Sequence, residues 1–392
     1  MAFDTPRRIQ VKYDEAAVKN MISLLQAAPF PDRAPIDAST PWEFGIEFDY
    51  LKKLKHMFEA EWSWKAFEEK IAKFDHYLVH FENDGDVLDL HYVHVKSPRS
   101  DAIPLILLHG WPGTFFDFHK VIEPLTNPPS SDLQAFHVVV PSIPGYFLST
   151  LPRRDGWSAT DTARIYNGLM TSVLGYSKYV AQGGDWGSLI LLNLEGLFPD
   201  SVVLAHFNFL FLSASPDTDQ SKYTDLEKRL LKRRSEFLTS GSGYFQIQST
   251  KPFTIGISIA SSPLAVLAYI GEKIYSWSDP KLVDPYDILN TVALYYLSGS
   301  FATSVVIYNQ ARKGTPGWRS QGSGGKVLLK NKFGYSVFPY ELVVVPKPEL
   351  EQFGPLVFHR EHSNGGHFPA LDIPNEYVGD LREFFGKYWG TP

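Results

Sequence analysis

The sequence predicts an α/β protein with a mostly parallel central sheet, an inserted helical cap and an N-terminal helical arm. Short β-branched runs, IPLILL, FHVVVP, YVAQ and VVLAHF, alternate with helical segments between residues 103 and 209. Apolar strands separated by helices indicate a parallel sheet that is buried on both faces. The alternation stops after this region and resumes with YSVFPYEL, so we expect a single insertion between the two parts of the sheet.

Four segments follow from these patterns. We expect residues 1–75 to form the arm, residues 76–210 the first part of the sheet domain, residues 211–315 the cap, and residues 316–392 the second part. The first sheet segment opens with a hairpin, HYLVHFEN and LDLHYVHVK around the turn DGD. The second is preceded by a Gly- and Ser-rich loop, GWRSQGSGGK, and closes with a helix over NEYVGDLREFFGKYW.

The arm is expected to be mainly helical. Asp14 stands at the N-cap of the amphipathic stretch EAAVKNMISLLQA, and a second amphipathic stretch contains Trp62 and Trp64. The apolar stripe of this arm needs a partner surface. We expect it to pack on the sheet domain or on a second copy of the chain, which keeps a homodimer open.

Composition excludes several classes of partner. The formal net charge is −6, whereas nucleic-acid and anionic-membrane binders carry a basic excess. The first twenty residues lack the apolar core of a signal peptide, and no run approaches the roughly 18–20 apolar residues that cross a bilayer. We therefore expect a soluble protein, with the cytoplasm as the default. The basic run KRLLKRR (Lys228 to Arg234) is interpreted as a solvated helix face.

Metal and nucleotide cofactors are not expected. The chain has no cysteine, and no phosphate-binding glycine motif occurs in it. His91 and His94 are three positions apart on a predicted strand, so their side chains point to opposite faces. His359 and His362 have the same spacing.

The stretch VAQGGDWGSLILL carries the main catalytic signal. Gly183, Asp185 and Gly187 reproduce a G-x-S-x-G elbow, with aspartate in the serine position between a strand and a helix. A carboxylate at this turn can attack carbon and form an ester that water then cleaves. Such chemistry favours an sp³ carbon with a leaving group over an acyl substrate. The alternative is an aspartate that only caps the following helix.

Two further motifs support the catalytic interpretation. HGWPG follows the strand IPLILL, where this architecture places a backbone donor of an oxyanion hole, so the amides of Trp111 and Trp186 are the expected donors. SNGGHFPALD places His367 on a loop after a late strand, as expected for the base in the order nucleophile, acid, histidine. His109 is the main rival, and its neighbours in a tight turn favour a structural role.

The acid must lie between Asp185 and His367, and Glu341 in PYEL is favoured because it follows a strand. Glu349 and Glu351 are interpreted as part of a solvated loop. Glu361 and Asp372 are also alternatives, although both stand close to the histidine in sequence.

Taken in order, HGWPG, GGDWGS, PYEL and GGHFPAL resemble the motifs of the microsomal-type epoxide hydrolases, in particular the soluble fungal members without a membrane anchor. The resemblance spans nearly the whole chain. It implies an α/β-hydrolase fold, an arm wrapped around the core, and conversion of a small apolar epoxide and water into a vicinal diol through an Asp185 ester. Glu341 departs from the aspartate of the fungal relatives and is shared with the animal members.

The resemblance also implies two cap tyrosines that bind the epoxide oxygen. SGYFQIQSTKPFTIG supplies Tyr244, and SFATSVVIYNQARK supplies Tyr308. A phenol is protonated at neutral pH and can donate a proton to the alkoxide that ring opening creates. Other cap aromatics could line an apolar pocket, although core packing is favoured for each of them, namely Phe245, Phe253, Tyr269 and Trp277.

Three other functions stay open at this point. A haloalkane-dehalogenase-like enzyme also uses an elbow aspartate followed by tryptophan, but it needs no proton donor for halide. A non-catalytic receptor would not need the aspartate, histidine and acid together. An epoxide-opening cyclase differs only in the group that completes the reaction, so the sequence does not separate it from a hydrolase.

Overall fold

Within the part of the chain that the structure describes, the sheet is formed by ten strands. They are β1 (Ala2–Phe3), β2 (Arg7–Ile9), β3 (His76–Asn83), β4 (Asp86–Val95), β5 (Ile103–Leu108), β6 (Phe136–Pro141), β7 (Tyr179–Gly183), β8 (Val202–Phe207), β9 (Phe333–Val337) and β10 (Leu356–Glu361). The computed structural model describes residues 2–37, 39–83, 85–211, 219–314 and 328–390. The Gly- and Ser-rich loop of the sequence, residues 317–326, lies outside the described residues.

The strand order is β1-β3-β4-β6-β5-β7-β8-β9-β10, with β2 also paired to β3. The pairs from β6 to β10 are parallel, and β3 and β4 form the predicted antiparallel hairpin. The mostly parallel sheet is therefore confirmed. Leu108 pairs with Gly183 and Gly183 pairs with Phe207, so the ends of β5, β7 and β8 are level. The loops that follow these three strands consequently meet at one edge, where open α/β sheets bind ligands.

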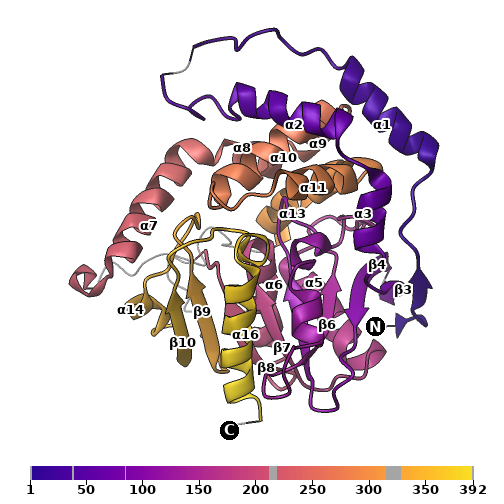
Figure 1. The fold of residues 1–392 in the computed structure, drawn as a ribbon. Helices are drawn as coiled ribbons and strands as arrows, with labels where there is room; N and C mark the ends of the chain where they lie inside the picture. Colours follow the sequence, from indigo (N-terminus) through magenta and orange to yellow (C-terminus); the bar gives the residue numbers. More distant parts are fainter. Residues whose placement is uncertain (1, 38, 84, 212–218, 315–327, 391–392) are drawn as a thin grey trace.

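Helices of the sheet domain cover the strands (Figure 1). They are α4 (Ile122–Thr126), α5 (Ala159–Gly168), α6 (Asp185–Leu197), α14 (Lys347–Leu350), α15 (Pro369–Asp372) and α16 (Pro374–Tyr388). Strands β5 and β7 are buried at nearly every residue, as their apolar sequences require. Helix α6 packs across β5, β7 and β8, which fixes the position of its first residue, Asp185.

In the described part of the segment predicted as the cap, seven helices are present. They are α7 (Asp225–Glu236), α8 (Gly243–Thr250), α9 (Pro252–Ala260), α10 (Pro263–Trp277), α11 (Pro285–Leu297), α12 (Phe301–Ser304) and α13 (Val306–Gly314). Figure 1 shows them stacked over one edge of the sheet. Short 3₁₀ or π turns complete the helical structure at Phe115–Phe118, Leu169–Val173, Gln220–Lys222 and Phe237–Gly241.

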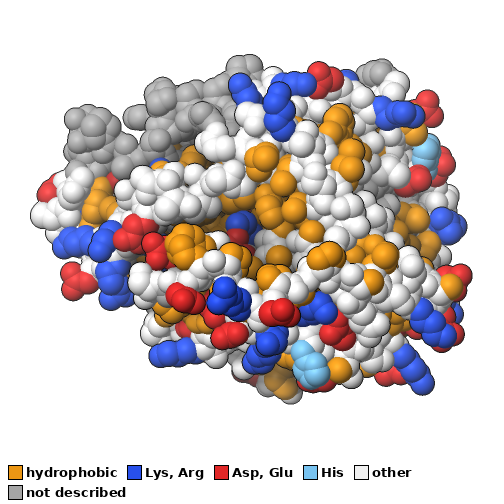
Figure 2. Space-filling view, turned by 90° about the horizontal axis from the view of Figure 1, so that it is seen from above, with side chains coloured by type: hydrophobic (Ala, Val, Ile, Leu, Met, Phe, Trp, Pro, Cys, Tyr) orange, Lys and Arg blue, Asp and Glu red, His pale blue; other side chains and the backbone are white. Residues whose placement is uncertain are grey.

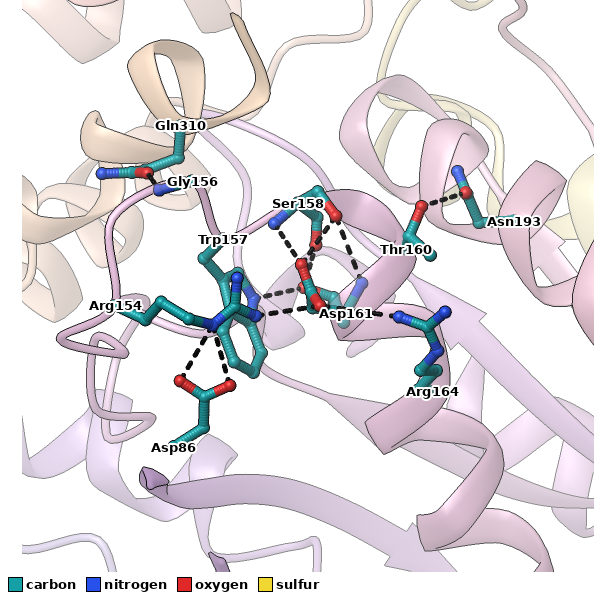
Figure 3. A network of polar contacts seen from close by, with 11 residues as sticks. Asp86, Arg154, Gly156, Trp157, Ser158, Thr160, Asp161, Arg164, Asn193 and Gln310 are labelled. Carbon is teal, nitrogen blue, oxygen red and sulfur yellow. Dashed lines mark hydrogen bonds and ion pairs between the residues drawn. The ribbon is translucent and has the colours of Figure 1, made fainter. Parts of the chain in front are cut away.

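A polar network fastens α13 to the sheet domain (Figure 3). Arg154 contacts Asp86 of β4 at 2.9 Å and Asp161 of α5 at 2.9 Å. In the same loop, the backbone N–H of Gly156 donates to the side chain of Gln310 on α13. The loop therefore holds the cap helix that carries Tyr308.

The arm contains α1 (Glu15–Ala27), α2 (Phe48–Ala60) and α3 (Trp64–Ile71), and Asp14 caps α1 as predicted. Sequence patterns missed β1 and β2, because two or three residues become a strand only by pairing with β3. The arm contacts the sheet domain through β1, β2 and α3, and it also contacts the cap. Helices α1 and α2 contact α10 and α11 of the cap, and Trp62 Nε1 donates to Asn290 Oδ1 at 2.9 Å.

The interpretation of KRLLKRR as a solvated face was wrong for one residue in particular. Arg233 is half-buried and donates from its guanidinium to three backbone carbonyls, those of Ser276, Tyr340 and Glu341. It therefore connects the cap with the loop that carries the predicted acid. Lys228, in contrast, is exposed.

Charges of both signs are mixed on the face that Figure 2 shows, and no large area of one sign appears among the side chains coloured there. Across the residues described above, no single helix is long and apolar enough to cross a membrane. Two bent helix pairs of the cap, α9 with α10 and α11 with the α12–α13 segment, meet the same length and composition test together.

Candidate active site

The predicted elbow is present between β7 and α6. Asp185 has a φ of 47°, in the left-handed region that side chains rarely adopt, and it starts α6 directly after Gly184. This conformation turns the carboxylate toward the loop after β5. The backbone N–H of Trp111 donates to Asp185 Oδ1 at 2.8 Å, so the HGWPG turn supplies a donor where it was expected. Trp186 follows in the first turn of α6, with its amide at the positive end of the helix.

His367 and Glu341 meet Asp185 at the same edge of the sheet. His367 Nδ1 lies 2.6 Å from Glu341 Oε1, and His367 Nε2 lies 3.4 Å from Asp185 Oδ2. Glu341 follows β9, and its Oε1 also accepts from the backbone N–H of Leu342 at 2.7 Å. The structure thus brings together the three residues that the sequence singled out.

Electrostatics favour the charged imidazole at this position. Burial acts to lower the pKa of His367, but the carboxylates of Glu341 and Asp185 outweigh it and raise that pKa to about 10. An imidazolium between two carboxylates is therefore the resting state at neutral pH. Removing the negative charge of Asp185, as ester formation would do, removes part of the cause of this shift.

The two predicted tyrosines line one apolar cavity together with Asp185. Tyr308 is buried, and its hydroxyl lies beside the Tyr244 phenol and the Trp186 indole. Burial and the nearby Asp185 carboxylate raise the pKa of Tyr244 well above its ordinary value. Both phenols therefore stay protonated at neutral pH. Trp111 lies beside them, stacked on Tyr244 with ring centroids 5.3 Å apart.

The walls of this cavity are apolar and largely aromatic: Trp186, Leu189, Phe209, Phe211, Phe237, Phe245 and Leu342. Of the cap aromatics considered from sequence, Phe245 lines the cavity, whereas Phe253 is 67% exposed. Trp277 instead packs edge-on against His367, with centroids 5.3 Å apart. Tyr269 packs edge-on against Trp111 at 6.0 Å, consistent with the core role favoured for it.

A second, more polar cavity of about 390 Å³ lies on another side of Asp185 and His367. Sequence reasoning missed the polar residues that line it, namely Asp117, Gln182, Asn208 and Tyr377. Burial raises the pKa of Asp117 to about 7. Two signals were available in the sequence: Gln182 and Asn208 are polar residues at the ends of the otherwise apolar strand runs YVAQ and VVLAHFNF.

The alternatives to these assignments have other roles. His109 accepts from the backbone N–H of Ile143 at 3.1 Å and its Nδ1 contacts the carbonyl of Gly110, as expected for a structural residue. Glu349 was wrongly placed in a solvated loop, because it is 2% exposed and accepts a hydrogen bond from Tyr223. Asp372 accepts from the backbone N–H of Asp279.

The remaining histidines do not gather into a metal site. His91 packs against His76 with their ring nitrogens 3.0 Å apart, whereas His94 contacts Tyr176 on the other side of the strand. Among the residues whose positions are described, no group of three or more potential ligands could hold a metal ion.

The elbow, the histidine after the last strand and the helical cap are the features of an α/β-hydrolase fold. Residues 103–207 match the family described as "alpha/beta hydrolase fold". Residues 6–118 match a second family, "Epoxide hydrolase N terminus". The chain is 32% identical to Epoxide hydrolase 1 of Sus scrofa, over 88% of this chain and 81% of that protein. It is 33% identical to juvenile hormone epoxide hydrolase 2 of Ctenocephalides felis, over 89% and 80%.

Among solved structures, the epoxide hydrolase of Aspergillus niger superposes with a TM-score of 0.87 at 32% identity and covers 98% of this chain and 97% of that one. This chain belongs to the epoxide hydrolase family, and it is a hydrolase of the α/β-hydrolase fold.

Proposed function

We propose that this enzyme opens a small apolar epoxide with the Asp185 carboxylate and hydrolyses the resulting ester to a vicinal diol. The observation that carries the proposal is a single cavity in which the Asp185 side chain faces the phenols of Tyr244 and Tyr308. A nucleophile on one side and two proton donors on the other match the needs of a strained ether, whose carbon is attacked while its oxygen is protonated.

The first step forms the ester. Asp185 Oδ1 is held by the Trp111 amide at 2.8 Å, which leaves Oδ2 to attack one epoxide carbon. The C–O bond of that carbon breaks, and the released alkoxide takes a proton from Tyr244 or Tyr308. Asp185 loses its charge in this step, so the pKa of His367 falls and the imidazolium can release its proton. That proton restores the phenolate to the neutral tyrosine.

The second step returns the carboxylate. His367 Nε2 removes a proton from water, and the hydroxide attacks the ester carbonyl carbon. The negative charge that develops on Oδ1 is stabilised by the amides of Trp111 and Trp186. Glu341 orients the imidazole and stabilises its charged form. The intermediate collapses with cleavage of the bond between its carbon and Oδ2, and the proton of the added hydroxyl passes to the departing alkoxide. The diol therefore leaves with the oxygen that belonged to Oδ2, and the carboxylate and imidazolium are restored.

The physiological setting is part of the same proposal. Epoxides alkylate nucleophiles, so ring opening is chemistry suited to detoxification. We place the enzyme in the cytoplasm, supported by a net charge of −6 that offers no general attraction to anionic lipid. No cofactor is required by either step.

Isotopic labelling tests the ester. In heavy-oxygen water, a single turnover with excess enzyme should place the label on Asp185 and leave the first diol unlabelled. Label in that first diol would refute the covalent route. Styrene oxide and a matched chloroalkane provide the comparison of substrates. Chloride release far faster than diol formation would instead assign the site to dehalogenation.

A further inference from the structure

Four buried side chains form a series of hydrogen bonds, called here the hydrogen-bonded chain. The series starts at Tyr377 on α16 and ends at Glu341. The Tyr377 hydroxyl on α16 donates to Gln182 Oε1. Gln182 Nε2 donates to Asn208 Oδ1 at 2.8 Å, and Asn208 Nδ2 lies 3.5 Å from Glu341 Oε2 as its donor. Each of the four residues is at most 3% exposed. The chain therefore connects α16, the end of β7 and the end of β8 with the loop after β9.

The hydrogen bonds of this hydrogen-bonded chain all run in one donor-to-acceptor direction. A side-chain amide has a donor end and an acceptor end, whereas a carboxylate only accepts. Because the Tyr377 phenol donates, Gln182 must turn its oxygen toward Tyr377 and its NH₂ toward Asn208. Asn208 then turns its own NH₂ toward Glu341. A reversed Asn208 would place an amide oxygen against the carboxylate, which is electrostatically unfavourable.

The backbone of the elbow at Gly184 lies directly against the Asn208 side chain of the hydrogen-bonded chain. A Cβ at Gly184 would lie 2.7 Å and 2.8 Å from the two terminal atoms of the Asn208 side chain. The glycine next to the nucleophile thus leaves the space that Asn208 occupies. The amide is held between the elbow backbone and Glu341, so its orientation depends on the hydrogen bonds at either end.

We propose that Tyr377, Gln182 and Asn208 are positioning residues that hold Glu341 for the hydrolytic step. Glu341 Oε1 faces His367 Nδ1, while Asn208 holds Oε2 and prevents rotation of the carboxylate about its last bond. A fixed carboxylate fixes the imidazole, with Nε2 directed at Asp185. The three residues line the polar cavity beside Asp185 and His367, and none of them lines the apolar cavity of the two tyrosines. The inference rests on the proposed function, because its readout is hydrolysis of the Asp185 ester.

The test measures the rates of ester formation and ester hydrolysis separately in Tyr377→Phe. This substitution removes only the hydroxyl at the end of the hydrogen-bonded chain that is farthest from Glu341. We expect ester hydrolysis to slow by ~2- to 15-fold, as for loss of a hydrogen bond between neutral groups, with ester formation changed less than twofold. Tyr179→Phe is the matched control. Tyr179 is also buried and donates to Asn167 Oδ1 at 3.1 Å, away from the site, so its loss should leave both steps unchanged.

A double-mutant cycle shows whether the effect passes through Asn208. Asn208→Leu should slow hydrolysis at least as much as Tyr377→Phe, and adding Tyr377→Phe to it should cost no more than twofold further. Gln182→Glu, which still accepts from Tyr377 but cannot donate to Asn208 as a carboxylate, should be as slow as Tyr377→Phe. Additive losses, or equal slowing of both steps, would overturn the positioning role.

The two proposals fail in different ways. If the wild-type enzyme formed no ester, the proposed function would fail. If the ester formed and Tyr377→Phe hydrolysed it at the wild-type rate, only the positioning role would fail. Thermal unfolding of Tyr377→Phe and Tyr179→Phe side by side shows whether the two variants are equally folded.

Discussion

At the scale of single residues, His367 serves the second step of the proposed reaction more than the first. Its Nε2 is 3.4 Å from Asp185 Oδ2, close enough to deliver a hydroxide to the ester but not needed for attack on the epoxide. His367→Gln should therefore accumulate the ester, detected by mass spectrometry as a mass increase on the peptide that contains Asp185. Glu341→Gln should slow turnover less, because the imidazole itself remains. Normal turnover by His367→Gln would contradict this assignment.

The pKa of His367 makes the hydrolytic step pH-dependent. In the free enzyme two carboxylates raise this pKa to about 10, and only neutral imidazole can act as base. Ester hydrolysis should thus accelerate as pH rises through the pKa of the esterified form, which lies below that of the free enzyme. NMR titration of the free enzyme should show an imidazolium at neutral pH, and Asp185→Asn should lower its pKa. An unchanged value in Asp185→Asn would contradict the ion pair.

The same shift has a consequence for stability. A folded pKa above the ordinary value of about 6.5 means that the native state binds the proton more tightly than the unfolded chain. The stabilisation is complete below pH 6.5 and is lost as pH rises through about 10.

In the proposed reaction, Tyr244 and Tyr308 act in the first step. Either Phe substitution should slow ester formation by ~10- to 100-fold, because a positioned proton donor is lost, and the double substitution should nearly abolish it. Hydrolysis of an ester already formed should change much less. Stopped-flow tryptophan fluorescence can follow ester formation, since Trp186 adjoins the reacting carboxylate. If the double variant formed the ester at the wild-type rate, the tyrosines would have no part in ring opening.

At the scale of elements, the approach of α6 to β5 depends on one glycine. A Cβ at Gly187 would lie 2.2 Å from the carbonyl oxygen of Leu108, which is backbone and cannot move aside. Gly187→Ala should therefore destabilise the protein by about 1–3 kcal/mol or more. Gly196→Ala is the control on the same helix. A Cβ there meets nothing within 4 Å, so the change should stabilise by about 0.5–1 kcal/mol. Urea unfolding measures both, and equal effects would contradict this account.

Strands and the elbow could be predicted because their signals are local. An apolar run such as IPLILL or YVAQ is long enough to identify a buried strand, and glycines mark the turn around Asp185. Strands β1 and β2 have no such signal, since their two or three residues depend on pairing with β3. Arg233 also differed from its prediction, because the carbonyls that bind it come from residues far away in sequence.

The residues of the candidate site likewise divide into those with a local sequence signal and those without one. Asp185, His367 and Glu341 follow from motifs and chain order, whereas the tyrosines required the resemblance to a family. The chain of Gln182, Asn208 and Tyr377 escaped prediction, because it is assembled from two neighbouring strand ends and a distant helix. Only the register of the sheet brings these residues together.

At the scale of the whole molecule, we expect the arm to be required for a soluble fold. Its helices α1 and α2 lie across the cap, and α3 places Phe67 edge-on against Phe116 of the sheet domain, with centroids 4.9 Å apart (Figure 1). Deleting residues 1–70 would expose these apolar faces and remove β1 and β2 from the sheet. We expect an insoluble product, assessed by fractionation and size-exclusion chromatography. A soluble, fully active truncation would contradict this role.

The path of the arm also affects how the protein unfolds. Residues 7–9 are paired with β3 of the sheet, while Trp62 is hydrogen-bonded to Asn290 of the cap, so one continuous segment is attached to both units. Unfolding of the cap would therefore detach the arm, and detachment of the arm would expose apolar surface of the sheet domain. We therefore expect calorimetry to show one melting transition for cap and sheet domain. Amides of α10 and α11 should exchange with solvent through the same global opening as those of β5 and β7.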